Sequence, residues 1–272
     1  MLNNSSLLLL ATIASYVPQI RRIALRKDCS NISAVYLWLN HILATEQFVI
    51  GIVILVEYEP VTDYPPPLKV WLDFLQFAVV WAGNGILLVD INLQARCRLT
   101  VHSFAQVLGF SPSRAKVKPT LFLSYVAFFF ISICPAIFVA TIPPHERDIP
   151  ASVLMVGHQW FKHPVITIIS IFAVVPQLHE LYLKRSKGAL SSHGSALQAL
   201  VFLVVAFCWP YRMAFDGDGH WPVVVRFKAW WEATGWAFTD NLVLAFGYGI
   251  VWIAIQVFQD REETSEMAPL LG

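Results

Sequence analysis

The sequence predicts an all-α, polytopic membrane protein with seven transmembrane helices, arranged as two parallel three-helix bundles plus a linking helix. Three observations predict this fold class: few charged residues, seven long apolar stretches and an internal repeat. Of the 272 residues, 57% are hydrophobic and only 14% are charged, whereas a soluble domain carries about 25% charged residues. A large part of this chain therefore avoids water.

Seven apolar segments are long enough to cross a bilayer, which takes about 20 mostly apolar residues per helix. Their apolar residues are continuous and do not alternate with polar ones, which favours helices over barrel strands. The first segment lacks the basic start and the cleavage site of a signal peptide, so we expect it to remain as a membrane helix. The seven segments are residues 5–23, 33–56, 70–91, 120–142, 164–183, 190–211 and 233–258.

The distribution of lysine and arginine predicts the orientation of these helices. The loops after the first, third and fifth segments, together with the C-terminal tail, hold 13 of the 19 Lys and Arg residues, and the opposite side holds 6. Cytosolic loops carry the excess of positive charge in membrane proteins. We therefore expect a luminal N-terminus and a cytosolic C-terminus.

One stretch of the chain repeats after 158 residues. Each copy has an apolar helix, a Pro-Gln pair, a basic pair and an apolar-Ser pair that opens the next helix. Proline removes a backbone hydrogen bond inside a helix, so we expect a bend at each copy. The glutamine amide is expected to satisfy freed backbone groups of its own helix or of a neighbour. The matching residues are Pro18-Gln19 and Pro176-Gln177, Arg26-Lys27 and Lys184-Arg185, and Ile32-Ser33 and Leu190-Ser191.

This pattern resembles the PQ-loop family, which includes cystinosin-like lysosomal exporters and, more distantly, the SWEET sugar transporters. The resemblance covers both Pro-Gln regions and the 3+1+3 order of helices. It implies parallel repeats with a substrate path between them, and hinges at Pro18 and Pro176 for alternating access. The implied divisions are residues 1–91 for the first unit, 92–142 for a cytosolic loop and the linking helix, 143–258 for a luminal loop and the second unit, and 259–272 for a cytosolic tail.

The chain departs from the exporters at two positions. They often carry an acidic residue 22 residues beyond the proline of the motif, where this chain has Asn40 and Gln198. Any proton coupling would therefore have to use other acidic groups.

Acidic residues inside the membrane are costly and are functional candidates by default. Asp73, Asp240 and Glu46 are the candidates for a substrate or proton path, and each has a plainer alternative. Asp73 could lie at the wet interface, and Glu46 could bond a neighbouring helix. Because its own helix offers no Lys or Arg at membrane depth, we expect Asp240 to face a wet cavity, where it could take up a proton from an acidic lumen.

Four amides lie at membrane depth and extend this list of candidates. Asn40, Asn84 and Gln198 could instead form hydrogen bonds that hold helices together. The fourth, Asn241, directly follows Asp240.

The C-terminal tail resembles an acidic dileucine sorting signal, in which an acidic residue precedes two leucines. Glu266, Leu270 and Leu271 have this spacing, although so short a pattern also arises by chance. Because the charge distribution places the tail in the cytosol, we expect it to bind cytosolic sorting adaptors. This prediction favours a vacuolar or lysosomal membrane.

Other function classes are not favoured by the sequence. The four cysteines are too widely spaced for a disulfide framework or a metal site, and no nucleophile triad or phosphate-binding loop is present. A net charge of +1 gives no general attraction to nucleic acid. We therefore expect no enzyme activity, cofactor or metal.

The best prediction is a transporter of small solutes, with amino acids as the first class to test, and with membrane lipid, a solute and protons as its partners. A seven-helix receptor is the alternative from another class, although the internal repeat speaks against it. A trafficking receptor or scaffold without transport is a third.

Overall fold

The computed structural model is mostly helical and has no strand in the part of the chain that it describes, which confirms the all-α prediction. The described residues are 2–26, 29, 31–62, 67–106, 119–186, 188–212, 227–228, 231 and 235–267. Each of the seven predicted segments is mostly helical where the structure describes it. The helices are α1 (Leu2–Arg26), α2 (Ala34–Thr62), α3 (Leu68–Gln106), α4 (Pro119–Thr141), α5 (Pro144–Val156), the π-helical turn η1 (Gly157–Lys162), α6 (His163–Ile171), α7 (Val174–Lys184), α8 (Ser192–Arg212) and α10 (Trp236–Met267).

Within the described residues, six helical stretches are long and apolar enough to cross a membrane. They include every predicted segment except the first. Helix α1 is long enough at 25 residues, but it has polar residues at both ends, with Asn3 and Asn4 at one and Arg21 and Arg22 at the other. These helices are compatible with a multi-pass membrane protein, and the first crossing stays a prediction.

The segment before Pro164, predicted as a luminal loop from residue 143, is helical instead. Helix α5 and η1 run directly into α6, so that His145–Lys184 forms a single apolar helical stretch of 40 residues. Proline and charged residues at the start of this stretch suggested a loop. Pro144, however, occupies the first helical turn, where its missing N–H is not needed. Helix α3 likewise continues to Gln106 into the predicted cytosolic loop.

The reversal between α4 and α5 is held by one buried arginine. The guanidinium of Arg147 donates hydrogen bonds to the carbonyls of Ala140, Ile142 and Val56. Ala140 and Ile142 lie at the end of α4, where intrahelical partners run out. The carbonyl of Val56 in α2 lies four residues before Pro60, which has no N–H to donate to it. Arg147 therefore joins α2, α4 and α5 at one end of the bundle.

The two predicted bends differ in the structure. Helix α6 ends at Ile171 and α7 begins at Val174, because Pro176 has no N–H for the carbonyl of Phe172. That carbonyl instead accepts a shorter-range bond from Val175 N at 3.1 Å. Around Pro18, by contrast, α1 continues as one helix.

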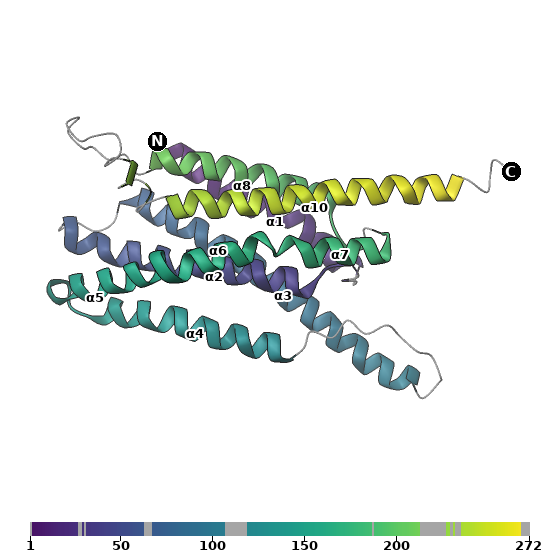
Figure 1. Ribbon diagram of the computed structural model, residues 1–272, viewed down its shortest axis with the longest axis horizontal. Helices are drawn as coiled ribbons and strands as arrows, with labels where there is room; N and C mark the ends of the chain where they lie inside the picture. Colours follow the sequence, from purple (N-terminus) through teal and green to yellow (C-terminus); the bar gives the residue numbers. More distant parts are fainter. Residues whose placement is uncertain are drawn as a thin grey trace.

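The long helices lie side by side, and the two ends of the chain point to opposite ends of the bundle (Figure 1). We call α1–α3 the first half and α5–α10 the second half. In the first half α3 packs against both α1 and α2, and in the second half α10 packs against both α7 and α8. Between the halves, α1 packs against α8 while α2 packs against α5, α6 and α7. Helix α4 packs against α2 and α5 at one edge.

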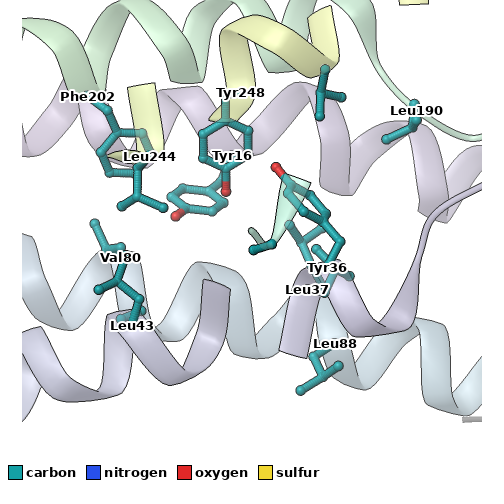
Figure 2. Packing of buried hydrophobic residues seen from close by; sticks show 14 of the residues in the cluster. Tyr16, Tyr36, Leu37, Leu43, Val80, Leu88, Leu190, Phe202, Leu244 and Tyr248 are labelled. Carbon is teal, nitrogen blue, oxygen red and sulfur yellow. The ribbon is translucent and has the colours of Figure 1, made fainter. Parts of the chain in front are cut away.

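The main hydrophobic core lies between the two halves. Figure 2 shows Tyr16 of α1 and Tyr36 of α2 close to Tyr248 of α10. The Phe202 ring stacks on Tyr248 with centroids 5.6 Å apart, and Tyr36 meets Tyr248 edge-on at 6.3 Å. Aromatic rings from both halves therefore interlock at the centre of the bundle.

Gly83 allows α3 to approach α1. A Cβ atom at Gly83 would lie 2.8 Å from the ring of Tyr16, so we expect Gly83→Ala to lower the free energy of unfolding by about 1–3 kcal/mol through overpacking. Gly247 is the matched control, because a Cβ there meets nothing within 4 Å. Gly247→Ala should be neutral or stabilising by up to about 1 kcal/mol, since alanine favours helix. Unfolding of both variants in detergent tests this, and equal effects would contradict it.

Candidate functional site

The glutamine of the first Pro-Gln pair reaches into the second half. From α1, Gln19 Nε2 donates to the carbonyl of Ala189 at 3.1 Å, and its Oε1 accepts from the backbone N of Ser191 at 2.7 Å. Gln19 and Ser191 are both buried. One side chain therefore satisfies a backbone acceptor and a backbone donor just before α8 begins.

The glutamine of the second pair makes the equivalent two bonds, from the second half to the first. From α7, Gln177 Nε2 donates to the carbonyl of Asn31 at 2.7 Å, and its Oε1 accepts from Ser33 N at 2.9 Å. The 158-residue shift that superposes the two glutamines also superposes Asn31 on Ala189 and Ser33 on Ser191. Each half thus uses its glutamine to close the connection between the first two helices of the other half.

Two arginines of α1 add contacts to the same end of the bundle. Arg22 and Arg26 both donate to the carbonyl of Gly188, at 2.9 and 3.0 Å. Asn31 Nδ2 donates to the carbonyl of Ser186 at 2.6 Å. This end of the two halves is joined by hydrogen bonds to backbone atoms.

A small cavity lies between the halves, next to these contacts. It has a volume of about 20 Å³, which is room for about one water molecule. All three helices of the first half and two of the second contribute to its lining. The polar lining residues are Gln19, Tyr36, Ser195, Gln198 and Tyr248.

Two amides near this cavity are buried without full hydrogen bonding. Gln198 lines the cavity, and Asn40 lies one helical turn beyond Tyr36 on α2. The Gln198 Nε2 donor has no hydrogen-bond partner among the described residues, whereas the Asn40 side chain interacts with the hydroxyl group of Tyr36 without good hydrogen-bond geometry. An unsatisfied buried donor costs about 1–3 kcal/mol. These positions, equivalent under the 158-residue shift, therefore offer donors to an acceptor between the halves.

Asn84 joins the two halves deeper in the bundle. Its Nδ2 donates to Tyr16 Oη at 3.0 Å and to the carbonyl of Val80, and its Oδ1 accepts from Tyr248 Oη at 3.4 Å. Asn84 of α3 thus connects α1 and α10.

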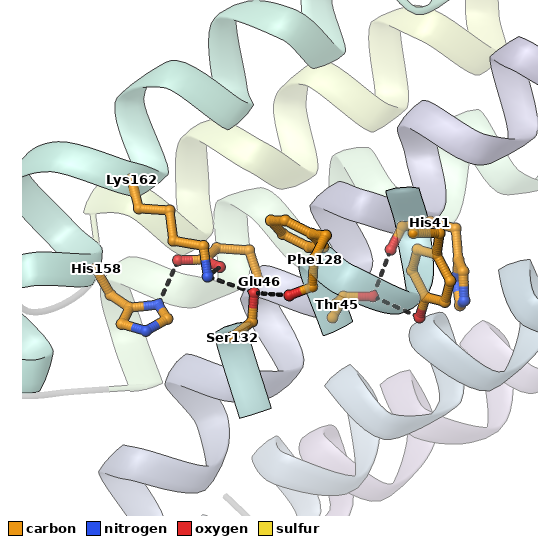
Figure 3. A network of polar contacts seen from close by, with 8 residues as sticks. His41, Thr45, Glu46, Phe128, Ser132, His158 and Lys162 are labelled. Carbon is orange, nitrogen blue, oxygen red and sulfur yellow. Dashed lines mark hydrogen bonds and ion pairs between the residues drawn. The ribbon is translucent and has the colours of Figure 1, made fainter. Parts of the chain in front are cut away.

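Glu46 lies in a charged network, which Figure 3 shows from close by. Its side chain is fully buried, with Oε1 2.5 Å from His158 Nδ1 and Oε2 2.9 Å from Lys162 Nζ. Lys162 also donates to Ser132 Oγ and lies over the Phe128 ring, with Nζ 4.7 Å from its centroid. Helices α2, α4 and η1 thus converge on one ion pair.

Asp240 lies beside this network and is also fully buried. Its Oδ1 accepts from Thr167 Oγ1 at 2.8 Å and lies 3.4 Å from His163 Nε2. Its Oδ2 accepts from Gln47 Nε2 at 3.2 Å. Asp240 therefore contacts side chains of α6 and α2, and it does not line the cavity described above; the expected wet surroundings are replaced by protein donors.

The remaining predicted residues fall elsewhere. Asn241 is buried and donates to the carbonyl of Ala237 in its own helix at 2.7 Å. Asp73 is half-buried near the start of α3 and is not among the contacts of Glu46 and Asp240 described above. Leu270 and Leu271 lie outside the described residues, as does the side chain of Glu266, so the sorting signal stays a prediction.

Sequence reasoning missed the second-half partners of the two carboxylates. They lie on η1 and α6, and the π-helical turn brings them together. The backbone N of His163 bonds to the carbonyl of His158, five residues earlier. In an α-helix, residues five apart point about 140° away from each other, whereas in this turn they share a face. The missed residues are His158, Lys162, His163 and Thr167.

Comparisons with protein-family models, curated proteins and solved structures gave no match. Within the described residues, no group of three or more His, Cys, Asp or Glu side chains is placed to hold a metal ion.

Proposed function

We propose that this chain is a PQ-loop transporter that moves small solutes across a vacuolar or lysosomal membrane by alternating access. In this proposal seven helices cross the membrane, with the N-terminus luminal and the C-terminus cytosolic. Two parallel three-helix units, α1–α3 and α5–α10, are joined by α4 as the linking helix. Amino acids are the first solute class to test, with protons as the coupling ion.

The packing order supports the two-unit arrangement. In each half the third helix packs against both the first and the second. The reciprocal bonds of Gln19 and Gln177 relate the halves by the same 158-residue shift as the sequence repeat. Repeats of this kind in transporters place the substrate between the two units.

The observation that carries the transport proposal is the pair of buried amides at equivalent positions of the two halves. Gln198 faces a cavity between the halves with a free Nε2 donor, and the Asn40 amide lies beside the hydroxyl group of Tyr36, which lines the same cavity. A solute with carboxylate or carbonyl oxygens could accept hydrogen bonds from both amides. Since the cavity holds about one water molecule, the halves have to separate before a solute can bind.

Separation at one end requires the glutamine contacts to break. Gln19 and Gln177 close the Pro-Gln end in this conformation, and the interrupted helix before Pro176 is the natural place for α7 to tilt. In the proposed cycle this end opens while the opposite end closes, with Pro18 and Pro176 as the hinges.

The direct test is uptake of amino acids and sugars by liposomes that contain the purified full-length chain, with and without a pH gradient. Empty liposomes are the baseline. Saturable uptake of at least one solute supports the proposal, and acceleration by a gradient supports proton coupling. If the whole panel gives only baseline uptake, the receptor or scaffold alternative is favoured.

For a transported solute, we expect Gln198→Leu to reduce uptake by about tenfold or more, because one lost hydrogen bond in a buried site is worth about 1–3 kcal/mol. The fold should be retained, since the Gln198 Nε2 donor has no partner to lose. The control is Gln256→Leu, which removes a half-buried glutamine that bonds Ser192 at 2.7 Å, away from the cavity lining. Equal uptake by the two variants would contradict the assignment of Gln198.

A further inference from the structure

The buried charges around Glu46 and Asp240 do not balance. The cluster contains two carboxylates and one ammonium group, together with the imidazoles of His158 and His163. With both imidazoles neutral, one negative charge remains. An uncompensated charge inside a membrane protein is expensive, so one added proton would make the cluster neutral.

The Glu46 side of the cluster is already neutral. Its carboxylate pairs with Lys162 at 2.9 Å, and His158 Nδ1 lies at 2.5 Å from the other oxygen, where a neutral imidazole can donate. Lys162 also has Ser132 and the Phe128 ring as neighbours. Adding a proton here would break an ion pair whose carboxylate is fully buried, which is strongly unfavourable.

The Asp240 side lacks a permanent positive charge. Thr167 and Gln47 contact it as neutral donors, and the titratable neighbour is His163. Thr167 Oγ1 lies 3.2 Å from His163 Nε2 and 2.8 Å from Asp240 Oδ1. The hydroxyl therefore links imidazole and carboxylate, and a proton can reside on either.

Other charged groups do not supply the missing charge. Among the described side chains, the groups whose charge acts on Asp240 are His163 and Glu46. The helices that pack against α10 carry further titratable groups, and none of these forms a hydrogen bond or ion pair with Asp240. They are His41 on α2, His179, Glu180 and Lys184 on α7, and His193 on α8.

We infer that His163 and Asp240 form a binding site for a single exchangeable proton, while the Glu46–Lys162 pair keeps its charges. The site depends on η1, which turns His158, Lys162 and His163 toward α2 and α10. Its role as the coupling site rests on the proposed transport function. The binding of the proton is independent of that function, because it follows from the charges and contacts alone.

The test counts protons taken up by the purified full-length chain in detergent, titrated over the pH range in which every variant stays folded. Asp240→Asn should take up one proton fewer than the wild type. Lys162→Met should take up one more, because two carboxylates then lack a fixed partner. The double variant Glu46→Gln, Lys162→Met removes the neutral pair and should match the wild type.

The double variant separates this assignment from one in which Glu46 is the proton acceptor. If Glu46 were the acceptor, the double variant would lose a proton and Asp240→Asn would not, and either result would overturn the inference. Should Asp240→Asn fail to fold, the Glu46→Gln, Lys162→Met double variant decides the question by itself, because it keeps the wild-type uptake only if Glu46 is not the acceptor. Neither a solute nor a gradient is present, so an absence of transport leaves this result intact.

Discussion

Replacing either motif glutamine by leucine is expected to lower the free energy of unfolding by roughly 2–6 kcal/mol. Gln19→Leu leaves the carbonyl of Ala189 and the N–H of Ser191 without their partner, and Gln177→Leu does the same to Asn31 and Ser33. Each buried backbone group left unpaired costs about 1–3 kcal/mol. Two such groups per variant give the stated range.

Unfolding in mixed detergent measures the effect. Gln256→Leu is the matched control, because its amide bonds a hydroxyl group, Ser192 Oγ, at 2.7 Å, so its loss should cost about 0.5–1.5 kcal/mol. The two motif variants should have similar effects, since their contacts are equivalent. A loss no larger than that of Gln256→Leu would show that water replaces the glutamine bonds.

Lys162→Met is expected to destabilise the chain by about 3–5 kcal/mol, because it leaves the carboxylate of Glu46 buried and without its cation. The Glu46 side chain has no exposed area, so solvent cannot compensate for the lost ion pair. The loss should be largest at neutral or higher pH, where few protons are available to neutralise the carboxylate.

Adding Glu46→Gln to Lys162→Met should recover most of this loss, since both charges are then gone. Replacing a whole buried ion pair is often close to neutral. The coupling energy from the double-mutant cycle is the decisive measurement. If the two single variants simply add, the ion pair contributes nothing and the network of Figure 3 has no energetic role.

The helices were predictable from sequence because continuous apolar runs leave few alternatives. The α5 segment was not, since Pro150 and the charged residues 145–148 are typical of a loop. Here Arg147 supplies the bonds that tie the start of this segment to α4 and α2. Such a contact between distant parts of the chain leaves no mark on local sequence.

The candidate site was predictable in part. The cost of a buried carboxylate indicates that Asp240 and Glu46 need partners, but it does not say which. Water was expected for Asp240, whereas the structure provides Thr167, His163 and Gln47. Three basic residues of η1 and α6 were overlooked because their shared face depends on a π-helical turn, which has no signal in sequence periodicity.

The crossed glutamine contacts also constrain how the chain is made. Gln19 and Ser33 are synthesised early, but their partners follow between 144 and 172 residues later. The first three helices can insert into the membrane and pack together before that, while the connection between α1 and α2 stays incomplete. That connection is closed only when translation has passed Gln177, so the joining of the halves is a late event in biogenesis and follows the insertion of most of the helices.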